Sequence, residues 1–228
     1  MAGDRQINHY RFEPNYRRIA KFDGNASEEE LLAERGVFAA DLEFVQTNCG
    51  SLGQRLIDAV PDWYYQSADE QGLEINCDLR LHRLEPGQYP AAPGWHCDAA
   101  QREVAFANLD ASTEVASSIV ACISSDPGGV SNPQFLNEAF TIDSVNEYGN
   151  APELWREVSE QLSETGACED SADGEMILFD PWTLHRVRPA KCSGIRLFFR
   201  MSIWEKPLGH RPGLVKSEQV YNLIRTAD

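Results

Sequence analysis

The residues at 194–204, Gly-Ile-Arg-Leu-Phe-Phe-Arg-Met-Ser-Ile-Trp, constrain the fold more than any other stretch of this chain. Successive side chains of a β-strand point to opposite faces of its sheet. One face of this strand therefore carries Arg196, Phe198, Arg200 and Ser202, and the other carries only apolar side chains. Because an apolar face must be covered by other structure, we expect the arginine face to point into a barrel or groove.

A second alternating run lies earlier in the chain. Ile75, Cys77, Leu79 and Leu81 alternate with polar residues, which predicts a half-buried strand. Turn signals at Pro86-Gly87 and from Pro90 to Gly94 follow it. Further strands are predicted at 104–109, 115–124, 139–143 and 175–179.

Helices are predicted before the strands, between them and in the tail. Ser27 and Glu30 form a capping-box pattern, and Asn150 caps a later apolar stripe. The predicted helices span 27–45 (apolar residues Leu31, Leu32, Phe38, Leu42 and Val45), 52–60 (closed by Pro61), 150–162 and 217–224.

Short strands supported by a few helices predict a mainly β protein with flanking helices, built as a jelly-roll or cupin-like barrel. The length of 228 residues fits one domain with a full core. Within a single domain at 1–228, we expect supporting helices at 27–66, a jelly-roll core at 75–204 and a C-terminal extension at 205–228.

The charge balance limits the classes of partner. Twenty basic and 36 acidic residues give a net charge of −16, which repels phosphate backbones and makes nucleic acid an unlikely partner. No apolar run approaches the roughly 18 residues of a membrane span. The six cysteines form no CxxC pair and no export signal precedes them, so we expect reduced thiols in a cytoplasmic protein. No pattern specifies an oligomeric state.

The sequence Trp95-His96-Cys97-Asp98 is the first candidate for chemistry. In a strand, residues i and i+2 share a face, so His96 and Asp98 could offer an imidazole and a carboxylate to one metal ion. Trp95 and Cys97 would share the opposite face and serve in packing. The alternative reading is a histidine at the end of a turn beside a surface aspartate.

His185 is the second candidate, because an apolar strand runs into an Asp-Pro turn just before it. Two histidines and one carboxylate form the facial ligand set of non-haem Fe(II) oxygenases, which leaves coordination positions open. The same donors also suit zinc. Taken alone, a histidine in this position is more often a core or surface residue than a metal ligand.

The arginine face of the last long strand is the third candidate. A buried arginine needs an anionic partner, and few acids are available near the arginine face, so a bound carboxylate would serve. Arg200 would lie on the same face and could meet an anionic group of a substrate. The alternative reading for both arginines is an exposed basic edge strand. Arg80, His82 and Tyr89 precede the His-x-Asp segment and are further candidates for the substrate site, or else solvated positions.

These residues together resemble the Fe(II)/2-oxoglutarate-dependent dioxygenases, whose pattern is His-x-Asp, a distal His and then a basic residue on the next strand. Here the pattern falls on His96, Asp98, His185 and Arg196. The stretch GEMILFDPWTLHRVRPAKCSGIRLFFRMSI is similar to the taurine-dioxygenase-like branch, and the phytanoyl-CoA-hydroxylase-like branch shares the first arginine. The resemblance covers about residues 75 to 204.

The resemblance implies a double-stranded β-helix in which His96, Asp98 and His185 hold Fe(II). It implies that 2-oxoglutarate chelates the iron, while Arg196, helped by Ser202, holds its distal carboxylate. With O2, such an enzyme hydroxylates its substrate and releases succinate and CO2.

Three readings of the function follow. The leading one is an oxygenase that hydroxylates a small metabolite, anionic or amino-acid-like. The second keeps the chemistry but acts on a protein or peptide side chain, for which the acidic surface favours a basic peptide. The third is a non-oxygenase metal-binding barrel that holds zinc or manganese. A nucleic-acid demethylase is the least favoured.

Overall fold

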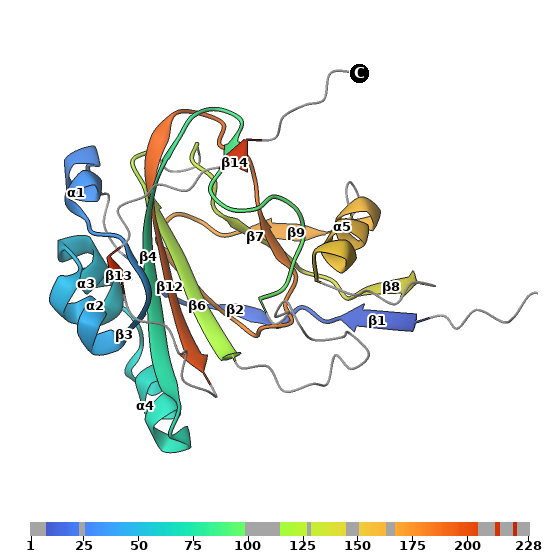
Figure 1. The fold of residues 1–228 in the computed structure, drawn as a ribbon, viewed down its shortest axis with the longest axis horizontal. Helices are drawn as coiled ribbons and strands as arrows, with labels where there is room; N and C mark the ends of the chain where they lie inside the picture. The colour runs from blue at the N-terminus through green and yellow to red at the C-terminus, as the bar shows by residue number, and fades with distance from the viewer. Residues whose placement is uncertain are drawn as a thin grey trace, which may run out of the picture.

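A seven-stranded antiparallel sheet forms the main layer of the protein (Figure 1). The computed structural model describes residues 8–22, 26–98, 115–126, 129–144, 151–162, 167–204, 213–214 and 221–222. The strand order in the main sheet is β13-β3-β4-β12-β6-β10-β2. Its strands are β2 (Tyr16–Lys21), β3 (Val37–Asp41), β4 (Glu74–Leu84), β6 (Val115–Ser124), β10 (Glu175–Phe179), β12 (Gly194–Trp204) and β13 (Gly213–Leu214).

A smaller three-stranded sheet, in the order β11-β7-β9, faces the main one. It contains β7 (Pro133–Leu136), β9 (Cys168–Asp170) and β11 (His185–Val187). Two further antiparallel pairs join β1 (Asn8–Phe12) to β8 (Phe140–Ser144), and β5 (Gln88–Tyr89) to β14 (Tyr221–Asn222). The two facing sheets form the double-stranded β-helix, so the predicted mainly β fold is confirmed.

Helices cover the outer face of the main sheet, as Figure 1 shows beside β3 and β4. They are α1 (Glu28–Ala33), α2 (Leu42–Asn48), α3 (Ser51–Asp58) and α4 (Asp62–Gln71), while α5 (Ala151–Gln161) lies beside the smaller sheet. No helix in the described part of the chain is long and apolar enough to cross a membrane.

The strand β12 has the two faces that its alternation predicts. Leu197, Phe199 and Met201 are fully buried in the cluster that joins the main sheet to the helices, and Ile203 is 3% exposed there. The opposite side chains point away from the helices, toward the smaller sheet. β12 lies between β4 and β6 along its length, so both its edges are hydrogen-bonded.

One predicted helix is interrupted by a strand. The helix that begins at the confirmed Ser27–Glu30 capping box ends at Ala33, and Val37–Asp41 pairs with β4 instead. Phe38 is 42% exposed on that strand, so its helical spacing was misleading. A new helix, α2, begins after Asp41, whose side chain accepts a hydrogen bond from the Phe44 amide at 2.7 Å. Burial of the strand's apolar residues against the sheet outweighs the local helical pattern.

Other predictions of local structure had mixed outcomes. Pro61 closes one helix and is also the N-cap of α4. That helix has no clear apolar stripe in the sequence, since only its Tyr64 and Ala68 are buried. The helix predicted at 217–224 is wrong at Tyr221–Asn222, where the chain pairs with β5 as a strand. The strand predicted at 104–109 and the cap at Asn150 lie outside the described residues. The division into 27–66, 75–204 and 205–228 stays a prediction.

We predict that Leu197→Ala lowers the free energy of unfolding by about 2–5 kcal/mol, because it leaves a cavity in the closed core. Leu32→Ala, on the exposed side of α1, removes the same atoms from a side chain that is 46% exposed. The control should change the free energy by no more than about 0.5 kcal/mol. Urea denaturation measures both variants, and equal losses would contradict the packing described here.

Candidate functional site

Two histidines far apart in the sequence are joined through their backbones. The His96 amide donates to the His185 carbonyl and the His185 amide to the His96 carbonyl, each at 3.0 Å. The Asp-Pro turn helps to place His185, because the Asp180 carboxylate accepts from the Trp182 amide and the Thr183 hydroxyl. This exchange brings the two imidazole rings to 4.5 Å between centroids.

Asp98 completes a compact group with these rings. One potential ligand atom from each of His96, Asp98 and His185 lies within 4.8 Å of the other two. His185 Nε2 lies 3.7 Å from Asp98 Oδ1. The predicted meeting of the three side chains is therefore observed. The segment is not a regular strand, however, since only His96 forms a β-bridge.

The other nitrogen of each ring is held by a backbone carbonyl. His96 Nδ1 lies 3.1 Å from the Gly94 oxygen, and His185 Nδ1 lies 3.0 Å from the Thr183 oxygen. A carbonyl can only accept, so each Nδ1 carries the proton and donates it. In the neutral ring this leaves the Nε2 lone pair free, and metal-binding histidines are commonly oriented in this way.

The charge states of the group suit a cation. Burial, followed by the neighbouring His185, lowers the pKa of His96 to about 4, so its ring is neutral near pH 7. Burial alone would raise the pKa of Asp98, but His185 and Arg200 outweigh it and lower that pKa. Metal ligands must be deprotonated in this way before they bind.

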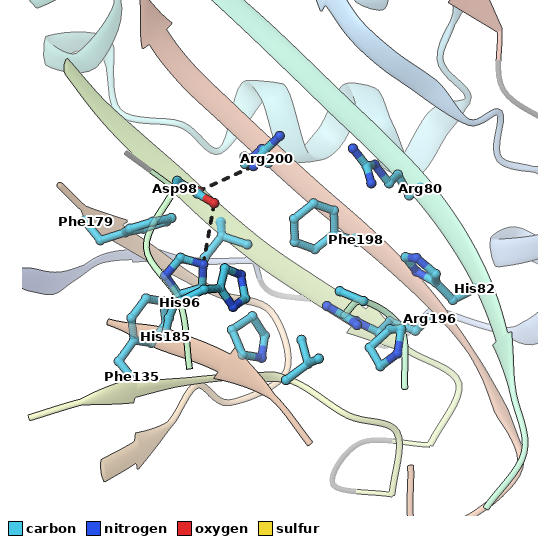
Figure 2. Close-up of a pocket in the computed structure, with 15 residues that line it drawn as sticks. Arg80, His82, His96, Asp98, Phe135, Phe179, His185, Arg196, Phe198 and Arg200 are labelled. Carbon is cyan, nitrogen blue, oxygen red and sulfur yellow. Dashed lines mark hydrogen bonds and ion pairs between the residues drawn. The ribbon is translucent and has the colours of Figure 1, made fainter. Parts of the chain in front are cut away.

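The three residues line one end of a pocket of about 670 Å³, part of it open to solvent (Figure 2). The pocket lies between the main and the smaller sheet, because its other lining residues come from both. Its walls are largely apolar. They include Val120, Phe179 and Phe198 of the main sheet and Pro133, Phe135 and Val187 of the smaller one.

Arg196 and His82 form the other end of the pocket, where Figure 2 shows them close together. They are directly paired across β12 and β4 and are only 1% and 3% exposed. Arg196 Nε and Nη2 lie 3.2 and 2.9 Å from the Cys122 sulfur. Among the described residues, Arg196 Nη1 and His82 Nδ1 have no hydrogen-bond partner. A ligand bound at this end of the pocket could therefore form hydrogen bonds with both of these buried nitrogens.

Arg200 lies in the pocket but is already paired with acids. Its Nη2 and Nε lie 2.6 and 3.0 Å from Asp78 Oδ2, and its Nη1 lies 3.4 Å from Asp98 Oδ2. The expectation that few acids are near the arginine face is therefore wrong for Arg200. Asp78 was not predicted as a site residue. It shares the polar face of its strand with Arg80 and His82, but only the pairing of β4 with β12 shows that it opposes Arg200.

The remaining candidates divide between the pocket and other places. Arg80 lines the pocket, with its guanidinium 4.5 Å from the Phe38 ring centroid. Ser202 does not: it lies about 20 Å along β12 from Arg196. Its hydroxyl is hydrogen-bonded to that of Ser118 at 2.8 Å. Tyr89 is also not among the lining residues, since it pairs with β14, although the next residue, Pro90, does line the pocket.

Trp95 and Cys97 are buried in the cluster that packs beside α5, away from the pocket lining. This agrees with the packing role predicted for both. The apolar walls, by contrast, were not predicted as site residues. Phe135 belongs to a four-residue strand that had no strong signal, and Phe179 was read only as part of a core strand.

No family model matches the sequence, and no curated protein matches it. Among solved structures it is similar to EvdMO1 (TM-score 0.44, 13% identity), covering 86% of this chain but only 48% of that one. It is also similar to AviO1 from Streptomyces viridochromogenes (TM-score 0.42, 8% identity, 87% and 93% covered). A third similarity is to EctD from S. alaskensis with 2-oxoglutarate and 5-hydroxyectoine (TM-score 0.35, 12% identity, 92% and 89% covered). At such scores, any function must be argued from this chain's own site.

We predict that His82 makes the protein less stable in mild acid. Burial, then Arg196 and Arg80, lowers the pKa of His82 to about 3. A folded-state pKa below the unfolded value of about 6.5 means that stability is present above pH 6.5 and is lost as the pH falls toward 3.

From pH 7 to pH 5 this loss amounts to about 2 kcal/mol of unfolding free energy. His82→Gln, which cannot titrate, should remove that part of the dependence in denaturant titrations of the metal-free protein. An unchanged pH dependence in the variant would show that His82 is accessible to protons in the folded state.

Proposed function

We propose that this chain is an Fe(II)- and 2-oxoglutarate-dependent oxygenase that hydroxylates a small anionic metabolite and releases succinate and CO2. The observation that carries the proposal is that a candidate metal site and a candidate carboxylate site lie in the same pocket. A His-Asp-His group lies at one end. At the other lies a buried arginine, one nitrogen of which has no hydrogen-bond partner in the described part of the chain.

The donor set fits Fe(II). Two neutral imidazoles and one carboxylate are the ligands of non-haem iron oxygenases, and they leave positions on the metal for other molecules. His96 and His185 would bind through Nε2, since each Nδ1 is held by a carbonyl. Asp98 would bind through the oxygen nearest His185. Zinc accepts the same donors, so the metal group alone does not decide the reaction.

The far end of the pocket fits a carboxylate. Arg196 Nη1 is a buried donor without a partner among the described residues, and an arginine fork binds carboxylates with good geometry. His82, paired across from it, offers a second nitrogen. Arg196 and the His-Asp-His group line the same pocket, so a dicarboxylate bound at the metal group would extend toward Arg196. A hydrolytic zinc site has no need of such an arginine.

The bound iron and keto acid would supply the oxygen activation and the electrons, and the chain would supply position and shelter. His96, Asp98 and His185 hold the metal at the pocket wall. Arg196 orients the keto acid by its distal carboxylate. The phenylalanines of both sheets keep water away from the reacting carbon of the substrate.

The charge of the pocket favours an anionic substrate. Its described lining residues include three arginines but only one carboxylate, Asp98, although the chain as a whole carries −16. Arg196 is assigned to the keto acid and Arg200 is held by two acids. Arg80 also faces Asp78, but at 3.7 Å rather than the 2.6 Å between Arg200 and Asp78, and its side chain is 32% exposed, so we assign the anionic group of the substrate to Arg80. Tyr89 and Ser202 have no part in this assignment.

We predict that Fe(II) and 2-oxoglutarate added without oxygen give the weak visible charge-transfer band of their chelate. His185→Ala should abolish the band, because it removes a ligand. Arg196→Gln should weaken 2-oxoglutarate binding by about tenfold or more, since one charged hydrogen bond contributes about 1.5–3 kcal/mol.

Arg188→Gln is the matched control for the arginine change. Arg188 is a half-exposed arginine, paired with Asp170 at 3.7 Å outside the pocket lining. That variant should titrate like the wild type. A folded wild-type protein that gives no band and retains zinc instead would contradict the oxygenase and favour the non-oxygenase barrel.

We predict that small carboxylates, sulfonates or phosphates are turned over in preference to neutral molecules and basic peptides. Succinate release across such a panel measures this preference. For the best anionic substrate, Arg80→Gln should raise KM about tenfold with little change in kcat, because it removes binding shared by ground and transition states. Faster turnover of basic peptides would support a peptide hydroxylase instead.

A further inference from the structure

The two carboxylate oxygens of Asp98 face different partners. Oδ1 lies 3.7 Å from His185 Nε2, on the side of the histidines. Oδ2 lies 3.4 Å from Arg200 Nη1, on the side of β12 (Figure 2). A carboxylate held at one oxygen has less freedom to turn, so the contact with Arg200 directs the other oxygen toward the histidines.

Arg200 is itself held in place by Asp78. Two of its nitrogens, Nη2 and Nε, meet the same Asp78 oxygen at 2.6 and 3.0 Å. The two residues are direct register partners on β12 and β4, so the sheet itself fixes their separation. The Asp78 side chain is 5% exposed and that of Arg200 is 27% exposed, which limits screening of the pair by water.

The second oxygen of Asp78 faces a different arginine. Arg80 Nη2 lies 3.7 Å from Asp78 Oδ1, next to the pocket wall. Asp78 therefore lies between two arginines, and it directs the fork of Arg200 so that Nη1 remains for Asp98. A free arginine at position 200 would instead be available to an anion in the pocket.

We propose that Asp78 is a positioning residue for the metal site: it fixes Arg200, which in turn orients Asp98 toward the metal. This inference rests on the proposed metal site. It gives Arg200 a role different from the substrate contact expected from the sequence, and it extends the metal site to a strand that contributes no ligand.

The test is the affinity for Co²⁺, which replaces Fe²⁺ without reacting with oxygen, measured by calorimetry without keto acid or substrate. Asp78→Asn keeps the size of the side chain and removes its charge. We expect it to weaken Co²⁺ binding about tenfold or more, as is typical when a residue that orients a ligand is lost. Arg200→Gln should weaken binding by a similar factor.

The double variant Asp78→Asn/Arg200→Gln tests whether Asp78 acts on the metal site through Arg200 or independently of it. If Asp78 acts through Arg200, the double variant loses no more affinity than Arg200→Gln alone. Losses that multiply would overturn the proposal. So would an unchanged affinity in Asp78→Asn.

Ser118→Ala is the structural control, because it removes a buried hydrogen bond between β6 and β12 that has no contact with Asp98. It should bind Co²⁺ like the wild type, and an equal loss there would show that the affinity reports only the state of the sheet. Thermal unfolding of each metal-free variant tests whether the fold is retained. A wild-type protein that binds no Co²⁺ would contradict the metal site itself, whereas a wild type that binds and an Asp78→Asn variant that binds equally would contradict only the role of Asp78.

Discussion

The pairing of β12 with β4 and β6 is the interaction on which the rest of the structure depends. One face of β12 is sealed by the helices through Leu197, Phe199 and Met201. The other face lines the pocket from Arg196 at one end to Arg200, which contacts Asp98, near the other. Burial of the apolar row thus commits the charged row to the interior, where each arginine needs a partner. Arg200 pairs with Asp78 across the sheet, whereas the guanidinium of Arg196 forms its hydrogen bonds within the described residues to the Cys122 thiol.

The fold could be predicted where alternation was strong. The runs at 74–84 and 194–204 have apolar and polar faces over many residues, and the structure confirms both strands. Short strands such as β7 and β9 could not be found, since three or four residues contain too little of a period. The segment around Phe38 was misread because its apolar spacing fits a helix, whereas its pairing with β4 is a long-range interaction that no local pattern contains.

The candidate site was predicted to a similar degree, and for similar reasons. His96, Asp98 and His185 stand next to turns and strands with clear signals, and the structure brings them together. Asp78 was missed because its importance depends on the register between two strands. Ser202 was placed in the site because it shares a face with Arg196. A shared face says nothing about distance along the strand, and Ser202 lies far from the pocket.

The arrangement of β12 also bears on which changes of length the chain can accept. An insertion or deletion of one residue between Arg196 and Arg200 would turn one of the two arginines into the helix-facing core and bring an apolar residue into the pocket. Arg196 and Arg200 would then no longer face the same cavity. Single substitutions on this strand keep its register and can therefore be accepted one at a time. Insertions and deletions are confined to the loops, where they leave the spacing between Arg196 and Arg200 unchanged.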